Sequence, residues 1–382
     1  MLLRVFRCKR KFSRSLRIVA TAAARTTVPC YALQRSQFTR LTPKATDFEK
    51  EIVRKSTQHL ARLTTMSDKL LTVGLAQIAP VWLDRQATLA KITDWIGKAG
   101  KAGCQLVAFG EALVPGYPFW VERTDGARFE SAVQKALYAH YVEQGVRIEA
   151  GDLDSVRSAA SKHRIAVYLG VMERAVNRGG HSVYASMVYV DSSGDIRSVH
   201  RKLMPTYEER LVWAIGDGHS LRTHALGPFT VGGLNCWENW LPLPRAALYA
   251  QGEDLHVAIW PGSLRNTEDI TRFIAREGRC YVVSVSGLMR KDDIPDGLPE
   301  IDLLRDTADA VMANGGSCVA APTGEWVLEP ETETESLRIA ELDHRLVLEE
   351  RQSLDVAGHY SRPDVTQLLV DRRRQSTTEF SD

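Results

Sequence analysis

Residues 229–240 read FTVGGLNCWENW: an apolar run ends at a single cysteine, Cys236, and the chain then turns into the segment LPLP. A short apolar run bounded by a turn is typical of a buried strand. The six cysteines of the chain are scattered, with no CxxC pair and no Cys/His cluster at zinc spacing, so the sequence indicates neither a disulfide framework nor a metal site. Cys236 is therefore expected to stand alone at the end of a strand, where its thiol needs a chemical explanation.

The same alternation of short apolar runs and longer helical patterns continues on both sides of this stretch. We expect strands at 71–78, 105–110, 165–174, 182–191, 229–236, 255–262, 280–288, 317–322 and 337–343. We expect helices at 88–103, 128–145, 152–164, 245–252 and 270–279. Periodicity alone favours a three-layer, doubly wound sheet.

No linker, repeat or low-complexity segment divides this pattern. The sequence therefore predicts one α/β domain over residues 70–370, in which 165–174 and 182–191 pair as a hairpin. Residues 371–382 are polar and are expected to form a frayed tail. The Asp-rich segment 291–316 is expected to form a surface hairpin or loop near the functional residues.

Residues 1–69 form an Arg-rich extension with no Asp or Glu before Asp47. This composition is typical of a mitochondrial transit peptide. Met66, however, opens a segment that reads like a natural start, so an over-long gene model explains the upstream residues equally well. We expect a cytoplasmic protein, or a mitochondrial one if the extension is real, and sequencing of the native amino terminus distinguishes the two.

The composition also narrows the classes of partner. The formal net charge is +2, and the basic residues gather in the extension, which leaves the body mildly acidic and without a predicted nucleic-acid surface. No apolar run is long enough to cross a bilayer, so no membrane partner is expected. With 44% hydrophobic and 25% charged residues, the chain is an ordinary globular protein in composition.

Three predicted strand ends carry chemically useful residues: Glu111 in FGEALVPGYPFW, Lys202 in VHRKLMPTYEER, and Cys236. Each residue type is common in loops or cores, so none is informative alone. Together they make a nucleophilic site, because a cation lowers the pKa of a thiol while a carboxylate takes its proton and later activates water. Such a trio hydrolyses carbon–nitrogen bonds without a metal or cofactor.

These three stretches, in this order, resemble the Glu–Lys–Cys motifs of the nitrilase superfamily. The resemblance extends over most of the body, from VGLAQIAPVWLD through GEALVPGYPFW, HRKLMPTYEERLVWAIGDG and NCWENWLPLPRAALYAQG to AGHYSRPDV. It implies a four-layer α-β-β-α sandwich in place of the doubly wound sheet. It also implies a homodimer or a larger homo-oligomer, up to a spiral. One departure is Gly110, where many relatives have proline.

The resemblance implies that Cys236 is the nucleophile, Glu111 the general base and Lys202 the catalytic lysine. A second glutamate is expected at Glu209, with its neighbour Glu208 as a competing candidate. The CWEN context and the HYSRPDV tail resemble true nitrilases more than the amidase, carbamoylase or ureidopropionase branches. The expected reaction converts a small nitrile to its carboxylic acid and ammonia through a thioimidate and a thioester on the cysteine.

The residues next to this trio are candidates for binding substrate: Tyr117, Trp237, Glu238 and Trp260. Aromatic residues after strands are also common core residues, so a packing role stays open for them. An amidase that uses the same trio on a small amide is the nearest alternative function. A binding or scaffold protein that kept the fold without the chemistry is a more distant alternative.

Overall fold

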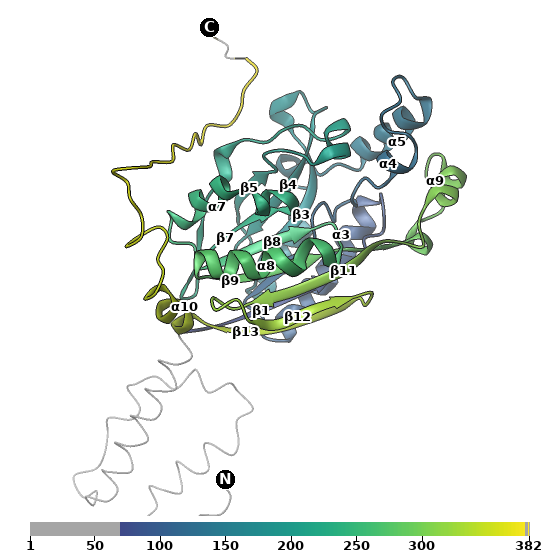
Figure 1. The fold of residues 1–382 in the computed structure, drawn as a ribbon. Coiled ribbons are helices and arrows are strands. Elements are labelled where there is room, and N and C mark those ends of the chain that lie inside the picture. Colours follow the sequence, from purple (N-terminus) through teal and green to yellow (C-terminus); the bar gives the residue numbers. More distant parts are fainter. Residues whose placement is uncertain (1–68, 379–380, 382) are drawn as a thin grey trace, which may run out of the picture. The chain divides into compact units, whose positions relative to one another are not determined.

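Residues 69–378 and 381 are described in the computed structural model of the chain, which is shown in Figure 1. Residues 1–68, and with them both interpretations of the extension, lie outside the described part. Two sheets make up the centre, with strand orders β13-β1-β2-β3-β4-β5 and β10-β11-β9-β8-β7-β6, and β12 pairs with β11. No helix among the described residues is long and apolar enough to cross a membrane.

The first sheet consists of β1 (Leu70–Gln77), β2 (Leu106–Phe109), β3 (Ala166–Arg174), β4 (Val183–Val190), β5 (Ile196–Arg201) and β13 (Ser336–Asp343). The second consists of β6 (His224–Leu226), β7 (Phe229–Asn235), β8 (Leu255–Trp260), β9 (Tyr281–Ser286), β10 (Leu288–Arg290), β11 (Val311–Ala320) and β12 (Trp326–Thr332). The longer helices are α3 (Arg85–Lys101), α5 (Ala132–Glu143), α6 (Asp154–His163), α7 (Pro242–Tyr249), α8 (Leu264–Gly278) and α10 (His344–Arg351). Shorter elements used below are α4 (Trp120–Arg123), α9 (Ile301–Thr307), η5 (Tyr207–Leu211), η6 (Gly218–Ser220) and η7 (Cys236–Trp240).

The alternation of side chains in β2 shows how the first sheet is covered. Leu106 and Ala108 belong to the core that lies between the two sheets. Val107 and Phe109 belong to the core that contains the buried residues of α3 and α6. Successive side chains of a strand point to opposite faces, so this sheet has the second sheet on one face and helices on the other.

The second sheet is covered in the same way. Val257 and Ile259 of β8 face the core between the sheets, whereas Ala258 and Trp260 pack with buried residues of α8. Figure 1 shows α8 lying across β8 and β9. The order of layers is therefore helices, sheet, sheet, helices, which confirms the four-layer sandwich and excludes the three-layer arrangement that periodicity favours.

Most predicted strands and helices are present, and β3 and β4 form the predicted antiparallel hairpin. The predicted strand 280–288 is divided at Gly287, whose backbone N–H donates to the carbonyl of Trp260 instead of continuing β9. Strands β5, β6 and β12 and helices α4, α9 and α10 were not among the predicted elements, because their apolar patterns are short. Segment 291–316 was predicted to be a surface hairpin or loop; it connects and partly forms the antiparallel pair of β10 and β11, and its helix α9 buries Leu304 against α4.

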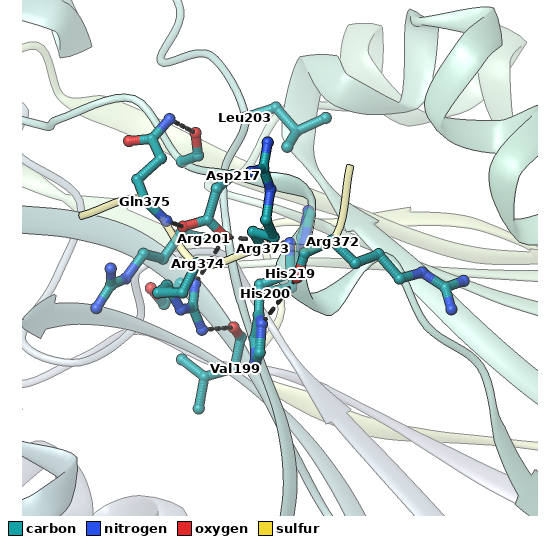
Figure 2. A network of polar contacts seen from close by, with 12 residues as sticks. Val199, His200, Arg201, Leu203, Asp217, His219, Arg372, Arg373, Arg374 and Gln375 are labelled. Atoms are coloured by element: carbon teal, nitrogen blue, oxygen red, sulfur yellow. Dashed lines mark hydrogen bonds and ion pairs between the residues drawn. The ribbon is translucent and has the colours of Figure 1, made fainter. Parts of the chain in front are cut away.

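The polar tail is not frayed over residues 372–375, which contradicts the sequence-based expectation (Figure 2). The Nη1 atom of Arg374 lies 2.9 Å from Oδ1 of the buried Asp217, and the backbone N–H of Gln375 donates to Oδ2. The side chain of Gln375 donates to the carbonyl of Gly216 at 3.0 Å. From the sequence alone these polar residues are expected to be solvated, because the buried carboxylate of Asp217, which binds them, lies more than 150 positions earlier in the chain.

We expect Arg374→Ala to lower the free energy of unfolding by about 1–3 kcal/mol, because it leaves the buried Asp217 carboxylate without its cationic partner. Chemical denaturation monitored by tryptophan fluorescence measures the change. Arg373→Ala is the matched control, since Arg373 pairs with Asp371 in solvent and should leave the midpoint unchanged. Equal midpoints for the two variants would contradict a stabilising role for the tail.

Candidate functional site

The structure brings together four residues that are distant in the sequence. Glu111 follows β2, Lys202 follows β5, Glu209 lies in η5, and Cys236 begins η7 at the end of β7. The Nζ atom of Lys202 lies 2.9 Å from Oε1 of Glu111 and 2.6 Å from Oε2 of Glu209, and these three side chains are almost completely buried. The sulfur of Cys236 and one oxygen of each glutamate lie within 4.8 Å of one another.

Cys236 is held at a sharp turn between β7 and η7. Its φ is +48°, in the left-handed region that residues with a side chain rarely adopt. Glu238 accepts a hydrogen bond from the backbone N–H of Asn235 at 2.9 Å. This bond closes the turn immediately around the thiol.

Glu111 reaches the same place from the other sheet. Its backbone N–H donates to the carbonyl of Trp260, the last residue of β8, at 3.0 Å. A Cβ atom at Gly110 would lie 2.9 Å from the backbone of both Trp260 and Gly287, so a side chain at this position would force the two sheets apart. The glycine that departs from the family pattern is thus required by the close approach that places Glu111.

Glu209 is the second glutamate of the site, and Glu208 is not. Glu209 is buried and accepts hydrogen bonds from Lys202 and from the backbone N–H of Thr206, both at 2.6 Å. Tyr117 donates its hydroxyl to Glu209 at 2.8 Å, whereas Glu208 lies 3.4 Å from that hydroxyl. The carboxylate of Glu209 therefore holds the ammonium of Lys202 in place and is itself held by two further donors.

The protonation states follow from burial and mutual charge. Burial raises the pKa of Glu111 to about 7, against the opposing effect of the Lys202 ammonium. Burial and the charge of Glu111 raise the pKa of the Cys236 thiol well above its usual value, and Lys202 opposes that shift. Burial alone would lower the pKa of Lys202, but the negative charges of Cys236, Glu111 and Glu209 raise it well above its usual value.

The resting site thus holds an ammonium, a neutral thiol and a carboxylate that titrates near neutral pH. Neither oxygen of Glu111 accepts a well-oriented hydrogen bond from the described residues. Lone pairs on Glu111 are therefore available to accept a proton from the neighbouring thiol of Cys236. The oxygens and the sulfur also form a set of possible metal donors, but the Lys202 ammonium already supplies a positive charge between the two carboxylates.

The four candidate substrate-binding residues divide into two groups. Tyr117 lies beside the site through its hydrogen bond to Glu209, and Trp237 follows Cys236 with 49% of its surface exposed. Trp260 is completely buried and packs in the same core cluster as Cys236, which favours the packing role. Substrate binding stays a prediction for Tyr117 and Trp237.

Glu238 does not present a free carboxylate to a substrate, which corrects the sequence-based interpretation. Its oxygens accept from the backbone N–H groups of Asn235 and Leu203 and lie 3.1 and 3.2 Å from Nε2 of His200. Leu203 directly follows Lys202, so Glu238 connects the segment of Lys202 to the segment of Cys236. The carboxylate is therefore a positioning group. Because it is buried among hydrogen-bond donors, it is not available to bind a substrate.

Two aromatic contacts of the site were not predicted. The indole ring of Trp213 lies 5.7 Å from Nζ of Lys202, measured to the ring centroid, and packs edge-on against Tyr117 at 5.5 Å. Burial and nearby negative charges raise the pKa of Tyr117 well above its usual value, so its hydroxyl remains a donor to Glu209. The family-like segment that contains Glu209 also contains Trp213, but only the folded chain shows that the ring covers the lysine.

The comparisons with known proteins agree with this geometry. The chain matches the family model for carbon-nitrogen hydrolases over residues 72–352. It is 35% identical over 315 residues to a protein named nitrilase 2 from an unknown prokaryotic organism, with 82% of this chain and 96% of that protein covered. It is 34% identical over 325 residues to the aliphatic nitrilase of Rhodococcus rhodochrous, with 81% of each chain covered.

Solved structures show the same fold at lower sequence identity. The NitFhit protein of C. elegans has a TM-score of 0.60 at 18% identity, with 81% of this chain and 69% of that chain covered. A carbon-nitrogen hydrolase from Helicobacter pylori G27 has a TM-score of 0.59 at 19% identity, with 78% and 97% covered. Together with the buried Glu111, Lys202, Glu209 and Cys236, these matches establish that the chain belongs to the carbon-nitrogen hydrolase family, within its nitrilase branch.

Proposed function

We propose that the chain is a nitrilase that converts a nitrile and two water molecules to a carboxylic acid and ammonia, with Cys236 as the nucleophile. The observation that carries the proposal is the Lys202 ammonium held between two buried glutamates beside a thiol at a strained turn. The named relatives at 34–35% identity are nitrilases, which supports a nitrile as the substrate class.

In the first half of the reaction, Glu111 takes the proton of Cys236 as the sulfur attacks the nitrile carbon. The nitrile nitrogen gains negative charge, which the ammonium of Lys202 stabilises and then neutralises through a proton from Glu111 or from Lys202 itself. The backbone N–H of Trp237 forms a hydrogen bond to the sulfur of Cys236, which lowers the pKa of the thiol. The product of this half is a thioimidate on Cys236.

In the second half, Glu111 removes a proton from a water molecule that adds to the thioimidate carbon. The tetrahedral intermediate takes up a proton on nitrogen and expels ammonia, which leaves a thioester. A second water molecule, activated by the same carboxylate, releases the carboxylic acid and restores the thiol. Loss of the thiol in place of ammonia from the first tetrahedral intermediate would release an amide, so a minor amide product is part of the proposal.

The alternative is an amidase that uses the same four residues on a small amide. Solved amidases from Nesterenkonia sp. share the fold, with a TM-score of 0.54 and 18% identity for one of them, which carries no argument about substrate. Besides the two nitrilases described above, two relatives from Nicotiana tabacum, at 31% and 30% identity, are named bifunctional nitrilase/nitrile hydratase. We therefore prefer the nitrile over the amide.

Cys236→Ala is expected to lower kcat for nitrile hydrolysis by about 10⁴-fold or more, because it removes the atom that forms the covalent bond. Ammonia, acid and amide are quantified after incubation with a panel of aliphatic and aromatic nitriles and with the matching amides. Cys318→Ala is the matched control, since Cys318 is another buried free cysteine and lies outside the site. Substantial activity of Cys236→Ala would exclude covalent catalysis at this residue, and turnover of amides alone would identify an amidase.

The value of kcat/KM is expected to fall about tenfold per pH unit below an apparent pKa near 7, as Glu111 gains a proton and ceases to be a base. The free energy of unfolding changes with pH in the opposite direction. Because the pKa of Glu111 is raised from 4.5 in the folded state, protonation of this group between pH 7 and 5 favours the folded chain. Activity lost at pH 5.5 should therefore return on readjustment to pH 8, and a flat profile down to pH 5 would contradict the role of Glu111.

We also propose that the protein is a homo-oligomer. Large apolar side chains are 42–63% exposed on η7 and the start of α7, namely those of Trp237, Trp240, Leu241 and Leu243. A contiguous set of this kind is typical of a surface that a partner covers. Light scattering coupled to gel filtration is expected to give a mass of at least two chains, and the mass of a single chain would contradict the proposal.

A further inference from the structure

A buried series of polar side chains begins at the backbone of Cys236 and extends to strand β8. Nδ2 of Asn239 donates to the carbonyl oxygen of Cys236 at 2.8 Å and to that of Leu234 at 3.2 Å. These two carbonyls flank the residue whose φ is +48°. The side-chain amide of Asn239 is completely buried, so it bridges the two sides of the strained turn without competition from water.

This series of polar side chains continues into the second sheet. Oδ1 of Asn239 lies 2.8 Å from Nε2 of His256 in β8, and Nδ1 of His256 lies 3.0 Å from Oε1 of Glu253, just before that strand. His256 and Glu253 are both completely buried. A histidine in the middle of an apolar strand is usually paired for stability alone, so its connection to the turn of the nucleophile is the feature that needs explanation.

The hydrogen bonds determine where the protons lie. Because both hydrogens of Nδ2 point at carbonyl oxygens, Oδ1 of Asn239 faces His256 as an acceptor, and Nε2 of His256 must carry a hydrogen. Nδ1 then shares one proton with Glu253, whichever of the two atoms holds it. The direction of donation is thus fixed from His256 to Asn239 and from Asn239 to the backbone of Cys236.

Two neighbouring features show that the fold accommodates these hydrogen-bonded polar side chains. A Cβ atom at Gly232 in β7 would lie 2.3 Å from Oε1 of Glu253, so only glycine leaves room for this carboxylate beside the strand that ends at the nucleophile. Arg245 donates to the backbone carbonyl of Asn239 at 2.6 Å and also pairs with Glu277. Asn239 is therefore held from its side chain by β8 and from its backbone by α7.

We propose that Glu253, His256 and Asn239 form a positioning relay that keeps Cys236 in its left-handed conformation and so keeps its sulfur beside Glu111 and Lys202. None of the three takes part in the chemical steps above. The proposal rests on the proposed function in so far as Cys236 is the nucleophile. A displacement of about 1 Å in a reacting group can cost about 10²-fold in rate, so a group that fixes the backbone of a nucleophile acts on kcat more than on KM.

The test compares His256→Leu with His256→Gln. Leucine removes the donor to Asn239, whereas glutamine can still donate an amide N–H to Oδ1 of Asn239. We expect His256→Leu to lower kcat for nitrile hydrolysis about 10- to 100-fold with KM within about twofold, and His256→Gln to retain kcat within about threefold. Equal losses in both variants, or none in His256→Leu, would overturn the relay.

His344→Leu is the matched control. His344 is also paired with a carboxylate, lying 2.8 Å from Asp254, the residue after Glu253, but it has no connection to η7. Its removal is expected to lower the melting temperature and leave kcat at a temperature below the transition unchanged. If His256→Leu and His344→Leu lose stability alike and both keep the kcat of the unchanged protein, His256 is merely structural.

Two further measurements keep the proposal testable if a variant or the function fails. Should His256→Leu not fold, Asn239→Asp replaces the donor to the Cys236 carbonyl by an oxygen of similar shape. It is expected to show the same loss of kcat, and an unchanged kcat overturns the relay. The rate at which iodoacetamide alkylates Cys236, followed by peptide mass spectrometry, requires no nitrile turnover. That rate is expected to fall in His256→Leu by a factor similar to kcat, and an unchanged rate overturns the relay even if the substrate is not a nitrile.

Discussion

The Lys202 ammonium, buried between the carboxylates of Glu111 and Glu209, is the interaction on which the rest of the site depends. Taking an ammonium out of water costs several kcal/mol unless its partners are close and correctly oriented. Glu111 and Lys202 follow strands β2 and β5 of the first sheet, whereas Cys236 follows β7 of the second, so the two sheets must meet before the thiol can lie beside this charge. The sheets approach each other closely here because the backbone N–H of Glu111 donates to the carbonyl of Trp260. Gly110 permits this approach because it has no side chain.

Strain in the backbone accompanies these charges at three turns. Ala112, Tyr207 and Cys236 all have φ between +42° and +48°, although none is glycine, and each lies next to or near a residue of the site. Such conformations cost about 1–3 kcal/mol each and persist only where the surrounding structure fixes them. Glu238, which bonds the backbone on both the lysine and the cysteine segments, and Asn239, which bonds the carbonyls around the cysteine, supply that fixation.

The sequence predicted most of the strands, the hairpin and the set of Glu111, Lys202 and Cys236, because strand ends and their reactive residues are local features, whereas Glu209 came from the family resemblance. The sequence pattern did not predict how the two sheets are layered. Strand β2 is buried along its whole length, and a strand buried on both faces has the same pattern in a three-layer and a four-layer fold. The family resemblance, not periodicity, supplied the correct arrangement. Roles that depend on partners distant in the sequence were also missed. Glu238 was interpreted as a substrate ligand, and His256 was not identified as a candidate.

The two ends of the domain meet in the first sheet, which bears on how the protein is made. Strand β1, at the start of the domain, pairs along its full length with β13, and the tail that binds Asp217 is later still in the chain. A ribosome delivers the amino-terminal strand first, so one edge of β1 has no partner until more than 260 further residues have been synthesised. Unpaired edges of this kind invite association with other chains. The unpaired edge of β1 is therefore the place where an incomplete chain is most open to association with other chains.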